Sequence, residues 1–254
     1  MTAGRHGGGE ADEQTQIEYE TQRILREAGR GSSPVVTVSW ARSVTGAIAA
    51  ADGARTPLSG PESLLLTHRL RAMHDAILVG IQTVLSDDPL LSVRLVEGAQ
   101  PQPVILDSLL RFPLGAKLLS RLDRTPWIFY LEGTTEAGEI RAAQGHGKAL
   151  AAAGARLFPV PPGKGGLDLP RVLARLLEEG MHSLMVEGGA RVLGSFISQG
   201  LASQAVITVS PAVVEGINGP QIPEEGRSKR ERHGRDEVVW IDLRARSNGL
   251  FARE

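Results

Sequence analysis

Eight short apolar runs recur along the chain, and segments with helical periodicity separate most of them. Continuous apolar runs of this length are typical of strands covered on both faces, as in a parallel sheet. This alternation predicts an α/β fold with a mostly parallel sheet and helices on both faces. No convincing helix separates the last two runs, so we expect an antiparallel C-terminal edge pair. The predicted strands are Val35–Val38, Ala76–Val79, Val104–Leu106, Trp127–Leu131, Arg156–Val160, Ser183–Val186, Ala205–Val209 and Val238–Ile241.

Four longer segments have the spacing of helices that pack on such a sheet. Three of them stop just before a glycine, which is the residue most often found after a helix end. A shorter helix is predicted directly after the second strand. The predicted helices cover residues 62–73, 81–85, 136–153, 169–179 and 190–199.

The composition excludes several classes of protein. The chain has 254 residues, a formal net charge of −1 and no cysteine. Near-zero charge disfavours a dedicated nucleic-acid binder, and the lack of cysteine excludes a disulfide, a thiolate nucleophile and a cysteine-ligated zinc site. No apolar run approaches the roughly 20 residues of a membrane span. We expect a cytoplasmic protein.

The N-terminal residues differ from the rest of the chain. Residues 1–33 are rich in glycine and polar residues, which predicts a flexible arm, although residues 17–28 have the pattern of a short polar helix. We therefore expect one folded domain over residues 34–254.

The stretch from residue 68 to residue 94 carries most of the functional signal. The strand Ala76–Val79 ends at Gly80, and the Asp-Asp-Pro sequence at residues 87–89 ends the short helix that follows. Ligands of open α/β sheets collect at the carboxyl ends of strands. An isolated Asp-Asp-Pro sequence is more often a turn with an aspartate cap. The predicted ligand contacts are Thr83, Asp87 and Arg94.

Two further strand ends carry polar groups. The strand Ser183–Val186 runs into Glu187 and two glycines that open a helix, and a helix start presents free N–H groups that suit a phosphate. Ser108 and Arg111 follow a third strand and suit a ribose 2′-phosphate. A tight turn without a ligand is an equal alternative for the first of these ends, and a turn with a solvated arginine is favoured for the second when each is taken alone. Together the three ends outline a cleft sized for a dinucleotide and a second ligand.

Other motifs receive structural interpretations. Residues 163–166, Gly-Lys-Gly-Gly, are predicted to be a flexible loop, and the basic segment from Arg227 to Arg235 a solvated loop. His68 and His74 are interpreted as structural or surface groups. No histidine spacing indicates a metal site, and no nucleophile elbow is found. Few reactive side chains are needed where a cofactor carries the chemistry, as in hydride transfer.

Five motifs identify a resemblance. In order and spacing, they resemble the reductase domain of bacterial riboflavin-biosynthesis deaminase/reductases over about residues 34–245. The resemblance implies a three-layer, dihydrofolate-reductase-like fold and a homodimer. The zinc deaminase domain that often precedes this reductase is not in the sequence, so we expect a stand-alone reductase. The motifs are RSVTGAIA (42–49), HRLRAMHDAILVG (68–80), TVLSDDPLLSVR (83–94), VILDSLLR (104–111) and VEGGA (186–190).

The resemblance also implies an activity and a set of site residues. The activity is NADPH-dependent reduction of the ribosyl group of 5-amino-6-(5-phosphoribosylamino)uracil, a phosphorylated pyrimidine, to the ribityl form. By motif position, the substrate contacts are Arg71, Leu91, Arg94 and Glu187, with both arginines on the phosphate. Asp87 is expected to orient the nicotinamide side and to help a proton reach the opened sugar. The implied NADPH contacts are Ala41, Thr83, Asp87, Ser108, Gly189, Ala190, Arg191, Val192, Leu193, Gly194 and Ser195.

The sequence departs from the family motifs near the substrate and nicotinamide pockets. Thr45 replaces an aspartate, and the bulky, charged Arg42 stands between Ala41 and Ser43, at the alanine–serine step of the family motif. Arg55 and Pro57 stand where serine and tryptophan are usual. Residues 201–204, Leu-Ala-Ser-Gln, also depart from the family pattern. These changes leave two alternatives to the pyrimidine reductase. One is a same-fold NADPH reductase of another heterocycle, such as a pterin, and the other is a catalytically silent ligand-binding homologue.

Overall fold

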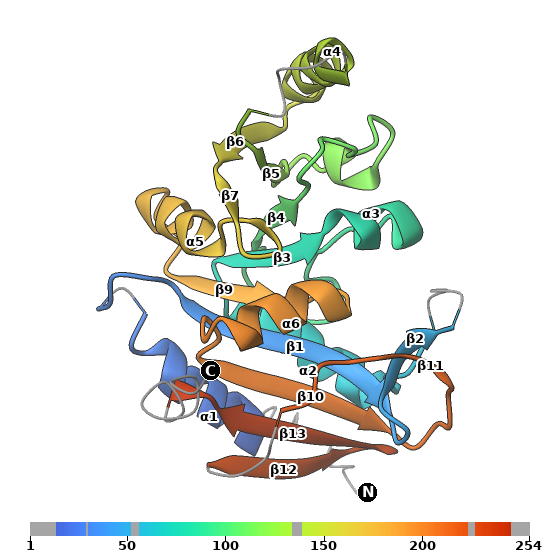
Figure 1. Cartoon of the computed structure of the whole chain (residues 1–254). Coiled ribbons are helices and arrows are strands. Elements are labelled where there is room, and N and C mark those ends of the chain that lie inside the picture. Colours follow the sequence, from blue (N-terminus) through green and yellow to red (C-terminus); the bar gives the residue numbers. More distant parts are fainter. Residues whose placement is uncertain (1–13, 29, 52–55, 134–138, 223–226, 245–254) are drawn as a thin grey trace, which may run out of the picture.

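A nine-stranded sheet forms the centre of the computed structural model, which describes residues 14–28, 30–51, 56–133, 139–222 and 227–244. Figure 1 shows its strands stacked in the order β12-β13-β10-β1-β9-β3-β4-β5-β6. Neighbours from β10 to β6 run parallel, and β10–β13 and β13–β12 are antiparallel. The bounds are β1 Val35–Ser43, β3 Ala76–Gly80, β4 Gln102–Leu106, β5 Trp127–Leu131, β6 Arg156–Val160, β9 Ser183–Val186, β10 Gln204–Ser210, β12 Ser228–His233 and β13 Asp236–Asp242.

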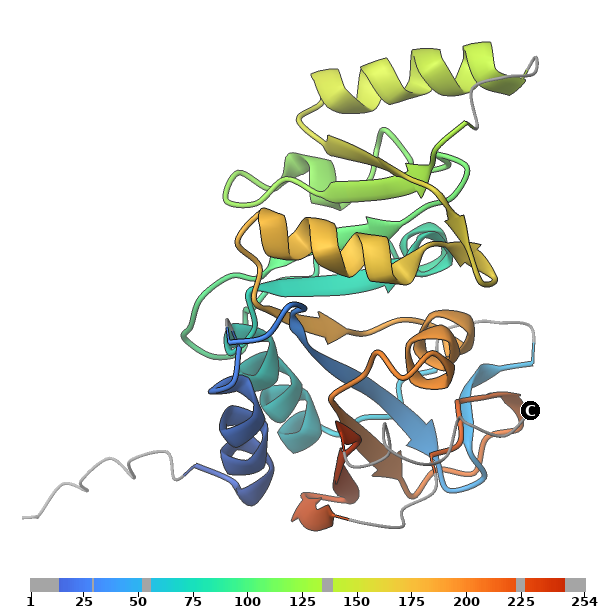
Figure 2. The same cartoon turned by 60° about the vertical axis from the view of Figure 1, so that its left-hand side comes forward.

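Helices cover both faces of this sheet, as Figures 1 and 2 show. Helices α5 and α6 bury leucines and Phe196 against one face, whereas α1 and α2 pack on the other face with Trp240. No helix in the described ranges is long and apolar enough to cross a membrane. The three-layer α/β prediction is therefore confirmed. The bounds are α1 Gln16–Leu25, α2 Pro61–Ala72, α3 Ile81–Asp87, α4 Glu139–Ala152, α5 Leu169–Glu178, α6 Ala190–Ser198 and the 3-10 helix η1 Lys117–Ser120.

The central strands form because their apolar residues are buried on both faces. All five residues of β3 are buried, and so are all four residues of β9. Strand β9 lies between β1 and β3 and pairs with both, so segments far apart in the sequence become neighbours. The predicted antiparallel pair is also present, between β10 and β13.

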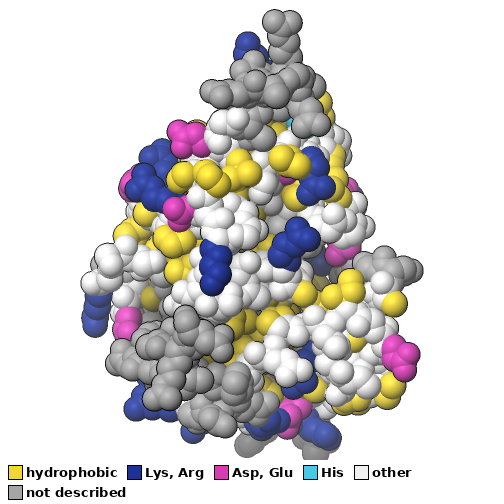
Figure 3. Space-filling view, viewed as in Figure 1, with side chains coloured by type: hydrophobic (Ala, Val, Ile, Leu, Met, Phe, Trp, Pro, Cys, Tyr) yellow, Lys and Arg dark blue, Asp and Glu magenta, His cyan; other side chains and the backbone are white. Residues whose placement is uncertain are grey.

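The basic segment after Arg227 is a strand, so its prediction as a loop is wrong. Residues 228–233 form β12, which pairs with β13 at the edge of the sheet. Arg230 makes an ion pair with Glu237 of the neighbouring strand. The segment has no apolar alternation because an edge strand needs charge to avoid pairing with other chains. On the face seen in Figure 3, basic and acidic side chains of the described residues are interspersed.

Residues 163–166 lie in a tight hairpin, not in a flexible loop as predicted. Strands β7 (Pro162–Gly163) and β8 (Gly166–Leu167) pair antiparallel, and Leu167 is buried in the core. A second small sheet joins β2 (Ala47–Ala50) to β11 (Gly216–Asn218). These strands have only two to four residues, too few for a periodic pattern to identify them.

Helix α1 corrects the prediction of a flexible arm over residues 1–33. Thr15 and Glu18 form a capping box at its start, and Ile17 and Ile24 are fully buried beside Trp240. Glu231 of β12 accepts a hydrogen bond from the Ile17 amide at 3.2 Å. Residues 16–25 are therefore part of the folded domain, whereas residues 1–13 lie outside the described residues.

A chain of buried hydrogen bonds fixes His74 beneath α2. Its Nδ1 lies 2.6 Å from the Leu70 carbonyl oxygen, and its Nε2 lies 2.7 Å from Oγ1 of Thr37. Gln204 donates to the same hydroxyl and accepts from the Trp240 indole. Burial lowers the pKa of His74 to about 4, so the imidazole is neutral. The structural interpretation of His74 is confirmed, and Gln204, one of the departures from the family pattern, belongs to this network.

Candidate functional site

Four neighbouring strands bring the predicted site residues to one edge of the sheet. The order β1-β9-β3-β4 is parallel throughout, so the carboxyl ends of these strands lie side by side. Ala41 lies on β1, Glu187 follows β9, Thr83 lies on the helix after β3, and Ser108 follows β4. The three strand ends that sequence reasoning singled out are therefore adjacent.

Arg71 and Glu187 form a two-pronged ion pair at the centre of this edge. Nε and Nη2 of Arg71 donate to the two carboxylate oxygens of Glu187 at 2.7 and 2.6 Å. Nη1 donates to the Ser92 carbonyl at 3.1 Å. Burial alone would lower the pKa of Arg71, but the Glu187 carboxylate raises it above its usual value. Arg71 therefore stays charged, and the pair joins α2 to the turn after β9.

His68 belongs to the same cluster, although the sequence analysis assigned it no functional role. Its side chain is buried, and Nδ1 accepts a hydrogen bond from the Arg94 amide at 3.1 Å. Burial, together with the charges of Arg71 and Arg94, lowers the pKa of His68 to about 4. A neutral imidazole next to two arginines is the state that accepts this bond. No sequence motif distinguishes such a histidine from a core histidine.

The two aspartates of the Asp-Asp-Pro sequence have different roles. Asp88 ends α3 in the left-handed conformation with φ of 41°, and its carboxylate accepts a hydrogen bond from the Lys117 amide at 2.9 Å. Asp87 is the half-buried last residue of α3, and no ion pair or hydrogen bond to its carboxylate is found within the described residues. Asp88 therefore ends the helix by its backbone conformation and uses its carboxylate to hold a distant segment rather than to cap the local turn, and Asp87 is left available to a ligand.

The start of α6 lies directly on two strand ends because both carry glycine. A Cβ atom on Gly80 would come within 2.9 Å of the Val192 side chain, and one on Gly188 within 2.7 Å. Gly189, the residue before α6, has open space where a Cβ would stand, and no side chain caps the helix there. Gly188 therefore admits Val192, whereas Gly189 exposes the free N–H groups of the helix start.

Two of the predicted contact residues have buried side chains. The side chain of Leu193 is fully buried in the core, and its amide donates to the Gly189 carbonyl, so it offers no surface to a cofactor. Leu91 is also buried, packed against Ile81 and Val84 with φ of 47°. Apolar residues next to a polar motif carry no signal that separates a pocket wall from the core.

Ser108 lies between a buried carboxylate and the β7–β8 hairpin. Asp107 is fully buried, its Oδ2 accepts from the Phe112 amide at 2.8 Å, and burial raises its pKa. This bond fixes the turn that carries Ser108 and Arg111. A Cβ built on Gly166 of the hairpin would lie 3.9 Å from the Ser108 hydroxyl, so the hairpin closes this end of the edge.

Thr45, which replaces the family aspartate, is bonded within the protein. Its hydroxyl lies 2.7 Å from that of Ser43 and donates to the Val214 carbonyl. It fixes the turn between β1 and β2 to the segment before β11. Pro57 is exposed, whereas Arg55 lies outside the described residues.

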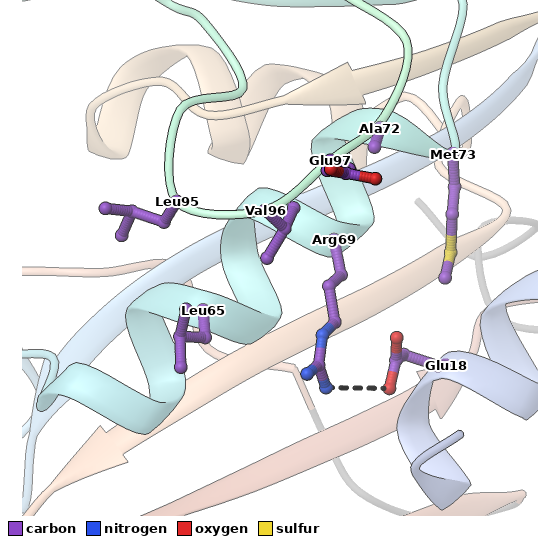
Figure 4. Close-up of a pocket in the computed structure, with 8 residues that line it drawn as sticks. All are labelled: Glu18, Leu65, Arg69, Ala72, Met73, Leu95, Val96 and Glu97. Carbon is purple, nitrogen blue, oxygen red and sulfur yellow. Dashed lines mark ion pairs between the residues drawn. The ribbon is translucent and has the colours of Figure 1, made fainter. Parts of the chain in front are cut away.

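A hollow of about 610 Å³ lies beside this cluster rather than in it. Figure 4 shows it between α1, α2 and the segment after Arg94, with an ion pair between Arg69 and Glu18 at 3.6 Å. None of the predicted site residues lines it. Its walls are Glu18, Leu65, Arg69, Ala72, Met73, Leu95, Val96 and Glu97.

Comparisons with known proteins agree with this architecture. The model of the RibD C-terminal domain matches residues 34–245. The chain is 32% identical to the riboflavin biosynthesis protein RibD of Aquifex aeolicus, covering 82% of this chain and 57% of the relative, so it spans little more than half of that protein. It is also 32% identical to the 2,5-diamino-6-ribosylamino-4(3H)-pyrimidinone 5′-phosphate reductase of Methanothermobacter thermautotrophicus, covering 83% of this chain and 95% of the relative.

Solved structures share the fold. Acinetobacter baumannii RibD superposes with a TM-score of 0.70 at 22% identity, covering 89% of this chain and 62% of that one. The riboflavin biosynthesis reductase of Saccharomyces cerevisiae gives a TM-score of 0.66 at 22% identity, covering 88% and 99%. The predicted dihydrofolate-reductase-like architecture is thus the one found in RibD structures.

Proposed function

Because the chain belongs to the RibD C-terminal domain family, we propose that it is an NADPH-dependent reductase of a phosphoribosylaminopyrimidine. The product is the corresponding ribityl compound of riboflavin biosynthesis. The first candidate substrate is 5-amino-6-(5-phosphoribosylamino)uracil. The observation that carries the proposal is the partly buried Arg71–Glu187 pair, whose carboxylate lies on the same turn that opens α6.

Arginines supply the phosphate side of the proposed substrate site. The guanidinium of Arg94 is exposed, and no ion pair to it is found in the described part of the chain. Arg71 keeps N–H groups beyond those bonded to Glu187 and Ser92, because a guanidinium has five donors. Planar guanidinium groups bind phosphate through two parallel hydrogen bonds. Glu187 orients Arg71 and offers acceptor oxygens to the hydroxyl groups of a sugar.

The residues around Gly189 fit a dinucleotide phosphate. The open space at Gly189 and the uncapped start of α6 provide N–H donors for a pyrophosphate. We assign the remaining contacts to Ala41, Thr83, Ser108 and the exposed Arg191. NADPH, when bound, would supply the hydride. The protein residues then hold the sugar carbon of the substrate at the nicotinamide and exclude water.

Asp87 is the proposed proton-handling residue. Reduction of the ribosyl group requires one hydride at the sugar carbon bonded to nitrogen and one proton at the ring oxygen released as the sugar opens. Asp87 stands at the end of α3, half-buried and without a protein partner within the described residues. An Asp87→Asn variant is expected to lose about tenfold or more in turnover. A loss of less than about threefold would remove this role.

A second pyrimidine is a candidate substrate for a specific reason. The Methanothermobacter relative, which is named for the 2,5-diamino-6-ribosylamino-4(3H)-pyrimidinone 5′-phosphate, is matched over 95% of its length. This compound and the uracil differ at one ring position, which lies away from the phosphate and the reacting sugar carbon. The clusters described above therefore suit both.

The test is steady-state oxidation of NADPH with each pyrimidine, with NADH and dihydrofolate as parallel controls. Turnover with NADPH and one of the two pyrimidines supports the proposal and selects the substrate. Turnover with dihydrofolate alone would favour a pterin reductase. The absence of both turnover and NADPH binding would leave a silent homologue.

We further propose that the enzyme is a cytoplasmic homodimer whose reductase domain extends N-terminally to include α1. Light scattering on the purified full chain measures the oligomeric state directly. A monomer at micromolar concentration would contradict it.

A further inference from the structure

The segment from Leu90 to Arg94 has no regular secondary structure, yet side chains hold its backbone at each step. Arg121 donates from Nη1 to the carbonyls of Leu90 and Leu91 at 2.9 and 3.2 Å. Gln100 accepts from the Val93 amide at 2.9 Å and donates to the Val93 carbonyl at 2.7 Å. Such bonds replace the ladder that a strand or helix would supply.

Two side chains of helix α2 bind the backbone of the same segment. Arg71 donates to the Ser92 carbonyl, and His68 accepts from the Arg94 amide. These two residues are three positions apart in the helix, so they project from one face. Helix α2, which carries Arg71, therefore also fixes the position of the Arg94 backbone.

The segment is held in a conformation that it would not adopt unaided. Leu91 has φ of 47°, in the left-handed region that a leucine rarely occupies. The side chains of Leu91 and Val93 are buried, which fixes the segment to the core between the polar contacts. An exposed arginine on an anchored backbone loses less conformational freedom on binding than one on a mobile loop.

We propose that His68 is a positioning residue that fixes the backbone of Arg94 so that its guanidinium meets the substrate phosphate. Gln100 and Arg121 hold the neighbouring backbone groups of the segment. We call the contacts of His68, Arg71, Gln100 and Arg121 with residues 90–94 the clamp. This inference rests on the proposed function for the identity of the ligand. The position of the Arg94 backbone, in contrast, depends only on hydrogen bonds within the protein.

Two substitutions at His68 separate positioning from simple packing. His68→Asn keeps an acceptor oxygen near the place of Nδ1, whereas His68→Gln keeps a polar side chain but moves its acceptor beyond that place. We expect His68→Gln to raise KM for the phosphorylated pyrimidine about tenfold with kcat within about threefold, and His68→Asn to restore most of this loss. His182→Gln, at an exposed histidine, is the matched control.

A second readout does not depend on turnover. Inorganic phosphate is titrated into each full-length variant by calorimetry, and we expect His68→Gln to weaken it by about tenfold while His68→Asn stays close to wild type. NADPH affinity should be unchanged in both. Equal effects of the two substitutions, or a loss confined to kcat, would overturn the inference.

The two proposals fail in different ways. If the wild-type chain does not reduce either pyrimidine, the proposed function fails, and the phosphate titration still decides the role of His68. If His68 variants unfold, Gln100→Glu provides the test, because it keeps the acceptor for the Val93 amide but loses the donor to the Val93 carbonyl. Unchanged phosphate affinity and KM in Gln100→Glu would then contradict the clamp.

Discussion

The two regions that meet at the Glu187–Gly189 turn differ in how far apart their parts lie in the sequence. On the proposed substrate side, Arg71 binds Glu187 across 116 positions, and the segment that carries Arg94 is held by side chains from three places in the chain. On the proposed cofactor side, the glycines and the start of α6 are consecutive residues. The substrate side is assembled by the fold, whereas on the cofactor side the turn proposed to hold the pyrophosphate follows from local sequence, and only its remaining contacts, Ala41, Thr83 and Ser108, come from other strands.

This difference predicts different responses to substitution. A network assembled from distant side chains loses several contacts when one member changes, because its bonds share partners. A helix start depends mainly on backbone groups, so it responds to changes in shape rather than in side-chain chemistry. The following variants either sharpen this contrast or remove it.

The largest effect is expected from Glu187→Gln. The change leaves the partly buried charge of Arg71 without its counterion, and because solvent screens this pair the cost is below the about 3–5 kcal/mol of a fully buried pair. We expect kcat/KM for the pyrimidine to fall about hundredfold, with the NADPH dissociation constant little changed. Steady-state kinetics and cofactor titration measure both. Glu178→Gln, which removes an exposed partner of Arg175, is the control. An equal loss in the two variants would end the contrast.

Gly188→Ala tests the cofactor side. The added methyl group would meet Val192 at 2.7 Å, and overpacking of this kind costs about 1–3 kcal/mol. We expect NADPH to bind about tenfold more weakly, while phosphate affinity stays unchanged. Adding Val192→Ala should recover part of the loss. Gly115→Ala, where space is also open but which lies outside the proposed site, is the control for backbone stiffening. NADPH binding that is unaffected by Gly188→Ala would argue against the turn as a cofactor site.

Ile24→Ala examines a region outside both sides. The side chain is fully buried between α1 and the sheet, and removing it should cost about 2–5 kcal/mol of unfolding free energy. Because α1 carries no site residue, KM and kcat should be those of wild type at a temperature where both proteins are folded. Denaturant unfolding gives the first quantity, with Tyr19→Ala, at a half-exposed position, as the control. Unchanged stability would mean that α1 is an arm after all.

Acidification is expected to lower the stability of the fold gradually rather than to disable either region. Burial lowers the pKa of His74 from 6.5 to about 4, so the unfolded chain takes up a proton that the folded chain resists. Stability from this group is complete above pH 6.5 and falls as the pH drops toward 4, by about 3 kcal/mol at most. Burial acts on His68 in the same direction.

Denaturant unfolding across that window measures the loss. His74→Gln should be less stable at neutral pH and should show a shallower dependence on pH. The same pH slope in wild type and variant would show that His74 is not the titrating group.

The sequence predicted the fold well because the strands can be recognised from short stretches of local sequence. Each predicted strand is an apolar run, and the glycines after the helices mark where these stop. The turn from Glu187 to Gly189 was predicted for the same reason. Strand β12 was missed because its charges, which protect an edge, hide the strand signal.

The substrate side could be predicted only in part. Arg71 and Arg94 were named through family motifs, but their connection through His68 and Ser92 depends on which segments the fold makes neighbours. A histidine that accepts a backbone N–H and one that fills a core have the same sequence signature, as His68 and His74 show. The roles of Asp87 and Asp88 are likewise distinguished only by the structure, in which Asp88 binds the Lys117 amide and Asp87 has no carboxylate partner among the described residues.

The central claim is that an arginine-lined phosphate site stands beside a dinucleotide site at one sheet edge. The most direct measurement compares NADPH oxidation with the phosphoribosylaminopyrimidine and with the same compound after removal of its phosphate. The account predicts turnover with the phosphorylated compound and a KM about a hundredfold higher without the phosphate, since two charge-assisted contacts are lost. Equal KM values for the two compounds would contradict it.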